Sequence, residues 1–154
     1  MGHLPGLAVA VAIGSLGVAR LWGPATTVRP VGRLLFFSDK LVLLEGDRQT
    51  TFPLASTTQI TLRYQGYQGE RLGPRAYASG HGNTIQLAAG PTYHFAIGNE
   101  AMQNTLRAEL KNWYLRQVNL KEYRLGSRTL LLHSALTYEQ LQRYKQELGV
   151  SLYD

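Results

Sequence analysis

The side chains best suited to ligand binding gather in and beside one Gly-rich stretch, residues 65–83, which reads QGYQGERLGPRAYASGHGN. Connections longer than about 12 residues are uncommon inside compact domains, and they are often functional. Arginine and tyrosine on such a loop can bind a phosphate, a carboxylate or a partner surface. The alternative is a plain extended hairpin or a mobile loop without a ligand. The candidate ligand-binding residues are Arg63, Tyr67, Arg71, Arg75, Tyr77 and His81.

The other chemistry-bearing residues form no catalytic or metal-binding pattern. His94 and His133 have no second histidine at the spacing of a metal-binding helix. The chain has no cysteine, which excludes disulfides, thiolate nucleophiles and cysteine-ligated metals. The carboxylates are scattered singly, without an acid/base couple. We therefore expect no catalytic residues, no cofactor and no metal ion, and we do not expect an enzyme.

Composition suggests that part of the chain is not in water. Apolar residues make up 44% and charged residues 17%, whereas about 25% charged is usual for soluble domains. The net charge of +6 favours anionic partners such as lipid headgroups. Nucleic acid is not expected, because the basic residues are interspersed with acids and no basic helix or RNA-binding aromatic motif is present.

The N-terminal segment is the most hydrophobic part of the chain. Residues 4–19 carry no charge, and Leu21 and Trp22 extend the apolar character past Arg20. A membrane-spanning helix needs about 20 mostly apolar residues, so we expect one over residues 4–22. Arg20 and Trp22 would then lie at the membrane interface. The basic residues that follow the segment predict a single span with the domain facing the cytoplasm.

Two alternatives to a retained span stay open. A secretory signal would be cleaved and would leave a secreted or periplasmic protein, but residues 1–3 lack the basic residues of a signal peptide. A buried core helix is the second alternative, and Pro5 and three glycines weaken a helix there in water. Residues 23–30, with a proline near each end, read as a linker.

The chain from residue 31 to 118 is expected to be a β unit closed by a helix. Short runs rich in β-branched and aromatic residues alternate with turn residues, as in antiparallel hairpins. Asn99 is a good N-cap, and a helical stripe follows it. The expected strands cover residues 32–37, 40–45, 48–54, 57–64, 83–88 and 92–97, and the stripe consists of Met102, Leu106, Leu110 and Trp113.

Residues 119–154 predict a second, smaller unit. Gly126 and Ser127 are expected to form a two-residue hairpin turn. Thr137 and Gln140 form a capping box that opens a last helix, and Gly149 ends it. A hairpin and one short helix are marginal alone in water. We therefore expect this extension to pack on the β unit.

A meander of hairpins closed by one amphipathic helix resembles the pleckstrin-homology-like (PH-like) superfold. The stretches LRYQGYQGE, NEAMQNTLRAELKNWY and KEYRLG are similar to those of small membrane-anchored Bacteroidota-type proteins of unknown function. The resemblance implies an α+β fold: a PH-like antiparallel β-roll or barrel with a capping helix, an appended hairpin and helix, and an N-terminal hydrophobic helix. It also implies the bacterial inner membrane.

The function expected from these features is a membrane-tethered interaction or scaffolding domain that binds a protein or an anionic membrane surface. Phosphoinositide binding does not carry over, because the first hairpin turn offers only Lys40, beside Asp39. The alternative function is an enzyme or a small-anion-binding protein that uses the loop over residues 65–83. That alternative requires the loop side chains to converge on a deep pocket.

Overall fold

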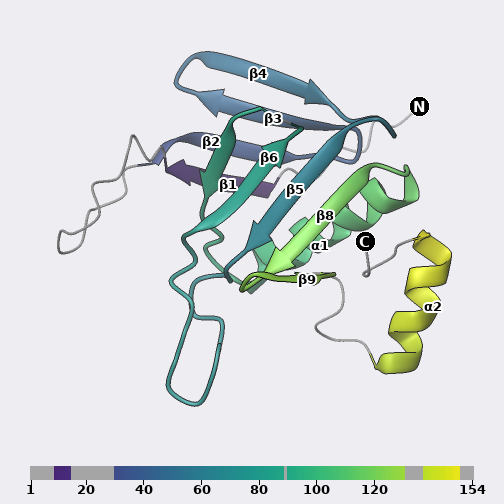
Figure 1. The fold of residues 1–154 in the computed structure, drawn as a ribbon. Coiled ribbons are helices and arrows are strands. Elements are labelled where there is room, and N and C mark those ends of the chain that lie inside the picture. Colours follow the sequence, from purple (N-terminus) through teal and green to yellow (C-terminus); the bar gives the residue numbers. More distant parts are fainter. Residues whose placement is uncertain (1–8, 15–29, 89, 131–136, 150–154) are drawn as a thin grey trace, which may run out of the picture.

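A computed structural model describes residues 9–14, 30–88, 90–130 and 137–149, which form nine strands and two helices (Figure 1). The first strands are β1 (Val9–Gly14), β2 (Pro30–Phe36), β3 (Lys40–Glu45) and β4 (Arg48–Pro53). Next come β5 (Gln59–Tyr64), β6 (Asn83–Leu87), β7 (Thr92–Phe95) and helix α1 (Glu100–Leu115). The described chain ends with β8 (Asn119–Arg124), β9 (Ser127–Thr129) and helix α2 (Tyr138–Leu148). The protein is thus of mixed α+β class, with more strands than helices, as predicted.

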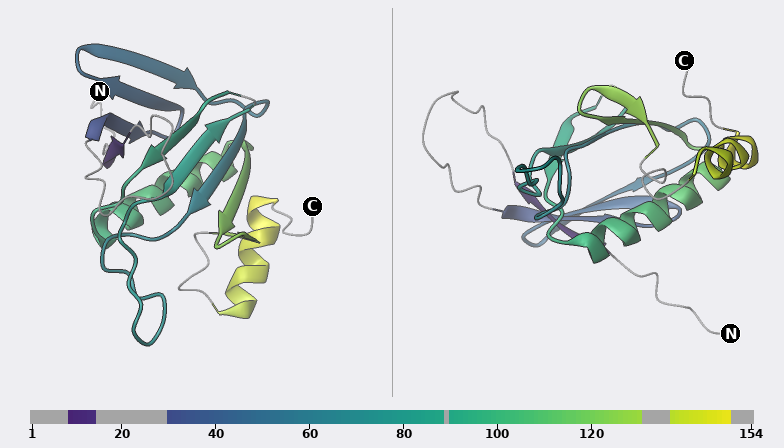
Figure 2. Two further views of the ribbon diagram at one scale, coloured as in Figure 1. Left: turned by 60° about the vertical axis from the view of Figure 1, so that its left-hand side comes forward. Right: turned by 90° about the horizontal axis from the view of Figure 1, so that it is seen from below.

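The strands form one curled sheet in the order β4-β3-β2-β1-β7-β6-β5-β8-β9. Two antiparallel meanders, β1–β4 and β5–β7, meet where β1 pairs with β7 at Ile13 and Phe95. The sheet curls around the core, and α1 lies along one side of it (Figure 2). Within the described chain β4 and β9 form the two edges, so the sheet is not a closed barrel.

The sheet differs from the predicted hairpins in one pairing. β8 runs parallel to β5, from the Gln59–Asn119 pair to the Tyr64–Arg124 pair. The pairing is possible because α1 carries the chain back to the end of the sheet where β5 begins. The local amino-acid sequence does not predict such a pairing between segments 60 residues apart.

The structure also differs from the sequence prediction within residues 4–22. Val9–Gly14 forms β1, in the middle of the sheet, where a transmembrane helix was expected. Its backbone pairs with β2 from Val9 and Phe36 onward. A short apolar run does not distinguish a buried strand from a helix, and strand pairing satisfies the backbone equally well. Residues 4–8 and 15–22, with Arg20 and Trp22, lie outside the described residues, and no described helix is long and apolar enough to span a membrane.

An aromatic cluster holds α1 against the sheet. The Phe36 ring lies 5.6 Å from the Phe95 ring and 5.7 Å from the stacked Trp113 ring. Trp113 Nε1 donates a 2.6 Å hydrogen bond to the carbonyl of Phe37, at the end of β2. This bond satisfies the indole N–H of a side chain that is otherwise fully buried.

Several local predictions are confirmed. The Asn99 side chain accepts from the Met102 amide and caps α1, and Thr137 and Gln140 form the capping box of α2. Gly149 ends α2 in a left-handed conformation. The turn between β8 and β9 is shifted by one residue from the prediction: it consists of Leu125 and Gly126, both with positive φ, as a two-residue hairpin of this twist requires.

The C-terminal extension shares the core of the β unit. Its strand β8 lies in the main sheet, and Leu141 of α2 belongs to the buried apolar cluster. The ammonium group of Lys111 on α1 lies 5.3 Å from the ring centre of Tyr144 on α2. The predicted continuous apolar run of β3 is buried over Leu41, Val42 and Leu43, so both faces of this strand are covered.

Candidate functional site

Residues 65–83 form a long hairpin that leaves the sheet between β5 and β6 and projects away from it (Figures 1 and 2). Its two arms are hydrogen-bonded to each other. Gly69 donates to the Ala78 carbonyl at 3.0 Å, Ala78 donates to the Glu70 carbonyl at 2.8 Å, and Leu72 donates to the Ala76 carbonyl at 2.8 Å. Near the tip the two arms form one isolated antiparallel β-bridge, between Arg71 and Tyr77.

The base of the hairpin is fixed by the fully buried side chain of Asn83. Its Oδ1 accepts from the Gln65 amide at 2.7 Å, and its Nδ2 donates to the carbonyls of Gly66 and Gly80 at 3.0 and 2.9 Å. Gly80 has a φ of +81°, and a Cβ there would lie 2.6 Å from the carbonyl oxygen of Ile97. The two ends of the hairpin are therefore joined through one amide side chain, where a glycine is required.

Glu70 ties the first arm of the hairpin to the sheet. Its Oε2 accepts from the Tyr64 hydroxyl at 2.5 Å and from the Tyr67 amide at 3.2 Å. Its Oε1 forms a 2.7 Å ion pair with Nη2 of Arg124 on β8. Gln103 of α1 donates to the Tyr64 hydroxyl from the other side. Strand β5, strand β8, helix α1 and the hairpin thus meet at one carboxylate and one phenol.

Burial raises the pKa of the Tyr64 hydroxyl well above its ordinary value, and the hydrogen bond to Glu70 and that carboxylate's negative charge raise it further. The phenol therefore stays protonated and donates to the carboxylate under ordinary conditions. This arrangement has the character of a structural anchor. The hydroxyl proton of Tyr64 is held in the hydrogen bond to Glu70.

The tip of the hairpin, residues 71–77, is exposed. Tyr77 is 66% exposed and Leu72 is 40% exposed, which is unusual for large apolar side chains. Arg71 and Arg75 are exposed beside them, and Arg71 Nε bonds only to the nearby carbonyl of Gly73. The single acid of residues 65–83, Glu70, is engaged at the base. The tip therefore offers two cations and two apolar groups without a compensating acid.

The structure separates the six predicted site residues. Arg71, Arg75 and Tyr77 lie together at the tip, and His81 is exposed on the returning arm. Tyr67 turns inward and packs against the apolar core. Arg63 lies on β5, where its guanidinium is 5.1 Å from the ring centre of Tyr123 on β8. The six residues thus do not lie together at one place in the described structure.

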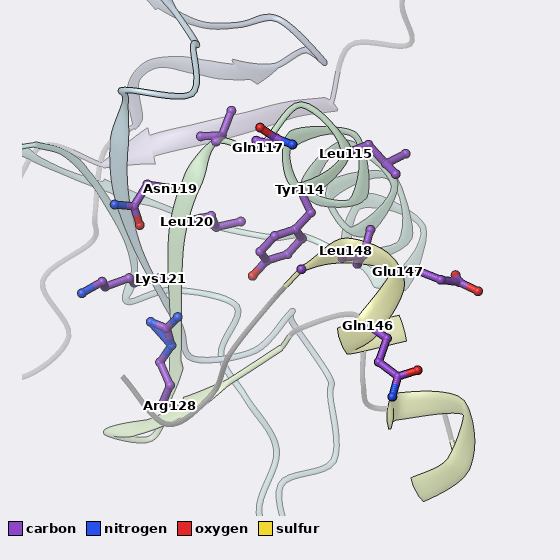
Figure 3. Close-up of a pocket in the computed structure, with 12 residues that line it drawn as sticks. Tyr114, Leu115, Gln117, Asn119, Leu120, Lys121, Arg128, Gln146, Glu147 and Leu148 are labelled. Atoms are coloured by element: carbon purple, nitrogen blue, oxygen red, sulfur yellow. The ribbon is translucent and has the colours of Figure 1, made fainter. Parts of the chain in front are cut away.

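A cleft of about 680 Å³ lies elsewhere, beside β8, between the C-terminal ends of α1 and α2 (Figure 3). No residue of the hairpin lines it. Tyr114, Leu120 and Leu148 give it an apolar wall, and Lys121 and Arg128 are its cations. Behind this wall the Tyr114 hydroxyl donates to the buried carboxylate of Glu122 at 2.5 Å. Burial, followed by the Glu122 charge, raises the Tyr114 pKa.

Sequence reasoning missed the residues that organise both regions: Asn83, Glu70 and Gln103 at the base of the hairpin, and Tyr123, Arg124 and Arg128 on the extension. Glu70 carried one usable signal, since it is the single acid in a stretch rich in arginine. Asn83 and Gln103 act through contacts with residues distant in the chain, and the residues of the extension depend on the pairing of β8 with β5 and β9, which brings Arg124 next to Tyr64.

Among the described residues no group of three or more histidine, aspartate or glutamate side chains is placed to hold a metal ion. No family model, curated protein or solved structure matches the chain. The geometry of the hairpin and of the sheet is therefore the basis for inferring a function.

Proposed function

We propose that this chain is a PH-like interaction domain that works at a membrane, and that the hairpin tip, residues 71–77, binds an anionic membrane surface. The order of the seven strands β4-β3-β2-β1-β7-β6-β5 supports the PH-like part of the proposal. It consists of two meanders joined through their first and last strands. An amphipathic helix, α1, follows the last strand directly, as the resemblance implies.

The exposed chemistry of the tip on a fixed stem is the observation that carries the proposal. An exposed leucine and an exposed tyrosine are suited to the interface between headgroups and acyl chains, where amphipathic aromatic residues are favoured. Arg71 and Arg75 flank them and would bind lipid phosphates. Because the stem is pinned by Asn83 and Glu70, the tip is presented in a fixed direction, and little ordering entropy is lost on binding.

The neighbouring end of the sheet adds to this surface. Leu125, in the turn between β8 and β9, is 66% exposed. This turn lies at the end of the molecule from which the hairpin projects (Figure 1). Three of the exposed large hydrophobic side chains, Leu72, Tyr77 and Leu125, thus belong to one end. A protein partner is the competing occupant of this surface, and the experiment below separates the two.

The test is co-sedimentation of the full chain with vesicles of phosphatidylcholine, with and without phosphatidylglycerol. Two variants address the tip: Arg71→Gln with Arg75→Gln, and Leu72→Ser with Tyr77→Ser. A matched control, Arg48→Gln with Arg116→Gln, removes the same charge at exposed positions outside the hairpin. At roughly 1 kcal/mol per arginine near an anionic surface, the tip charge variant is expected to bind about 30-fold more weakly.

The control variant is expected to keep at least half of the wild-type affinity, since its charges do not face the bilayer. If the wild-type protein co-sediments with neither kind of vesicle, the membrane proposal is overturned. A protein would then be the expected partner of the tip. Equal losses in the tip and control variants would also overturn it, because binding would then follow net charge alone.

Tethering through residues 4–22, as the sequence predicts, is an alternative to the sheet that contains β1. A retained transmembrane helix over this range and the strand β1 cannot coexist, since Val9–Gly14 would have to leave the sheet. Alkaline extraction of membranes from cells that produce the full chain tests the tether. Protein that stays with the membranes at alkaline pH supports it, whereas release into the supernatant or cleavage after Ala19 contradicts it.

A further inference from the structure

A row of directly paired residues crosses the outer face of the sheet. Arg128 pairs with Tyr123, Tyr123 with Arg63, Arg63 with Thr84, and Thr84 with His94. Paired residues on neighbouring strands share a face. The neighbours of Arg63 along β5, Leu62 and Tyr64, are fully buried, so this row faces away from the core.

Tyr123 lies at the centre of a cationic cluster in this row. The guanidinium carbon of Arg63 is 5.1 Å from its ring centre, and that of Arg128 is 5.7 Å away. The two arginines come from the strands on either side of β8, so they flank the ring. Lys121, two residues before Tyr123, shares its face of β8. The cluster therefore has three cations and one phenol.

Among the described residues, the strands that form this face place no carboxylate on it beside the three cations. Strands β5, β6, β7 and β9 contain no aspartate or glutamate, and the one acid of β8, Glu122, is buried against Tyr114 on the other face. The acid of the adjoining cleft, Glu147, comes from α2 and lies across the cleft from Arg128 and Lys121 (Figure 3). The charge of Arg128 also acts on the buried Tyr114–Glu122 pair, so the excess positive charge at the sheet surface is mainly that of Arg63 and Lys121.

Arg128 adds an independent sign of a missing partner. Its Nε and Nη1 atoms are buried and have no hydrogen-bond partner within the described structure. Buried guanidinium nitrogens nearly always have an acceptor, because an unsatisfied buried donor costs free energy. The same side chain lines the cleft of about 680 Å³, which has room for a ligand.

We infer that Arg63, Tyr123 and Arg128, with Lys121 at the edge of the cleft, form a binding site for a phosphate group. A phosphate ester carries up to two negative charges and three acceptor oxygens, which matches three cations and a hydroxyl. One carboxylate would leave part of this set unsatisfied. Cation–π contact with the Tyr123 ring orients the guanidinium groups of Arg63 and Arg128 beside its hydroxyl-bearing side chain.

The site is separate from the hairpin tip, and its test does not depend on the proposed function. The experiment is titration of the ¹⁵N-labelled full chain with sodium pyrophosphate, followed by amide and arginine side-chain NMR signals. We expect shifts centred on Tyr123, Arg63 and Arg128. Arg63→Gln and Arg128→Gln should each weaken binding by about tenfold or more, as expected for a charge-assisted contact. The control Arg48→Gln should change the affinity by less than twofold.

Arg63 is exposed, so its variant tests the site even where Arg128→Gln lowers the stability. Succinate, titrated in the same way, should bind at least tenfold more weakly than pyrophosphate. The inference is overturned by shifts spread evenly over the surface arginines, by equal losses in Arg48→Gln and Arg63→Gln, or by succinate binding as tightly as pyrophosphate.

A lipid headgroup and a soluble phosphate ester can both supply the phosphate. The Leu72→Ser and Tyr77→Ser variant separates them, because its hairpin no longer carries the apolar groups of the tip. Binding of this variant to vesicles that contain phosphatidic acid, lost on addition of Arg63→Gln, would identify a lipid headgroup. Binding of pyrophosphate without vesicle binding would identify a soluble phosphate. Both results support the site, and the absence of both contradicts it.

Discussion

The base and the tip of the hairpin over residues 65–83 differ in the burial and hydrogen bonding of their side chains. At the base, Asn83 is fully buried and Glu70 is mostly buried, and their side chains are hydrogen-bonded to other parts of the fold. At the tip, Leu72 and Tyr77 are exposed, and Arg71 Nε donates a hydrogen bond to the nearby carbonyl of Gly73. Buried polar groups that are fully paired specify one geometry. Exposed apolar and cationic groups that add nothing to the fold indicate a surface kept for a partner.

This contrast also distinguishes the hairpin from a flexible loop. A loop without function has no need of a buried asparagine that joins its two ends, or of a glutamate shared by two strands and a helix. The contacts at the base thus fix the direction of the hairpin, and the proposed binding of the tip to a membrane surface would use that fixed direction. Substitutions in one region at a time test this difference between the base and the tip.

The largest effect on stability is expected from Asn83→Ala. The change removes three hydrogen bonds: the Gln65 amide and the buried Gly66 carbonyl lose their Asn83 partner, whereas the Gly80 carbonyl still accepts from the Ile97 amide. We expect a loss of about 3 kcal/mol or more in the free energy of unfolding, measured by urea denaturation. Ser79→Ala, in the same hairpin, removes one exposed hydrogen bond and serves as the control. A stability equal to that of the control would mean that the base is not fixed by Asn83.

Glu70→Gln should have the next largest effect. It removes the charge that pairs with Arg124 and weakens the acceptor for the Tyr64 hydroxyl. We expect about 1–2 kcal/mol of destabilisation, since the pair is partly buried and hydrogen-bonded. Glu45→Gln, at the exposed end of β3, should change the stability by less than about 0.5 kcal/mol. If the two variants lose similar amounts of free energy of unfolding, Glu70 does not stabilise the base of the hairpin.

Alkaline pH should destabilise the protein through its buried phenols. The folded-state pKa values of Tyr64 and Tyr114 are raised, so both phenols stay protonated in the fold while the unfolded chain ionises them near pH ~10. Their contribution is complete below that pH and is lost as the pH rises above it, at about 1.4 kcal/mol per pH unit for each tyrosine. Tyr64→Phe should make the decline of stability above pH ~10 shallower. An unchanged slope in the variant would contradict the raised pKa.

The smallest effect on stability is expected at the tip. Changing Leu72 and Tyr77 together to serine removes no buried contact, so the free energy of unfolding should change by less than about 0.5 kcal/mol. The measurement is the same urea titration. A loss as large as that of Glu70→Gln would show that the tip packs on the domain and is not available to a partner.

Local chemistry explains which parts of the fold could be predicted. The caps of α1 and α2 and the strands β2 to β7 follow from residues close together in the chain, such as Asn99 with Met102 and Thr137 with Gln140. The β1 strand and the β5–β8 pair could not be predicted, because an apolar run such as VAVAIG is equally compatible with helix and strand, and parallel pairing has no local signature.

The same reasoning accounts for the candidate site. The stretch over residues 65–83 was recognisable from its glycine, arginine and tyrosine content, and Arg71, Arg75 and Tyr77 do lie together at its tip. The buried groups that orient it were not recognisable, since Asn83 and Gln103 act through contacts made across the fold. The cluster around Tyr123 depends on the register of β8 with β5 and β9, which the residues alone do not reveal.

The central claim, that the tip inserts at an anionic membrane surface, can be measured with an environment-sensitive fluorophore. The chain has no cysteine, so Tyr77→Cys and Tyr138→Cys each give one labelling position, at the tip and on exposed α2. With vesicles containing phosphatidylglycerol, the label at position 77 should become brighter, shift to the blue and be quenched by a lipid-borne quencher, while the label at position 138 stays unchanged. A label at position 77 that behaves like the one at position 138 would contradict the claim.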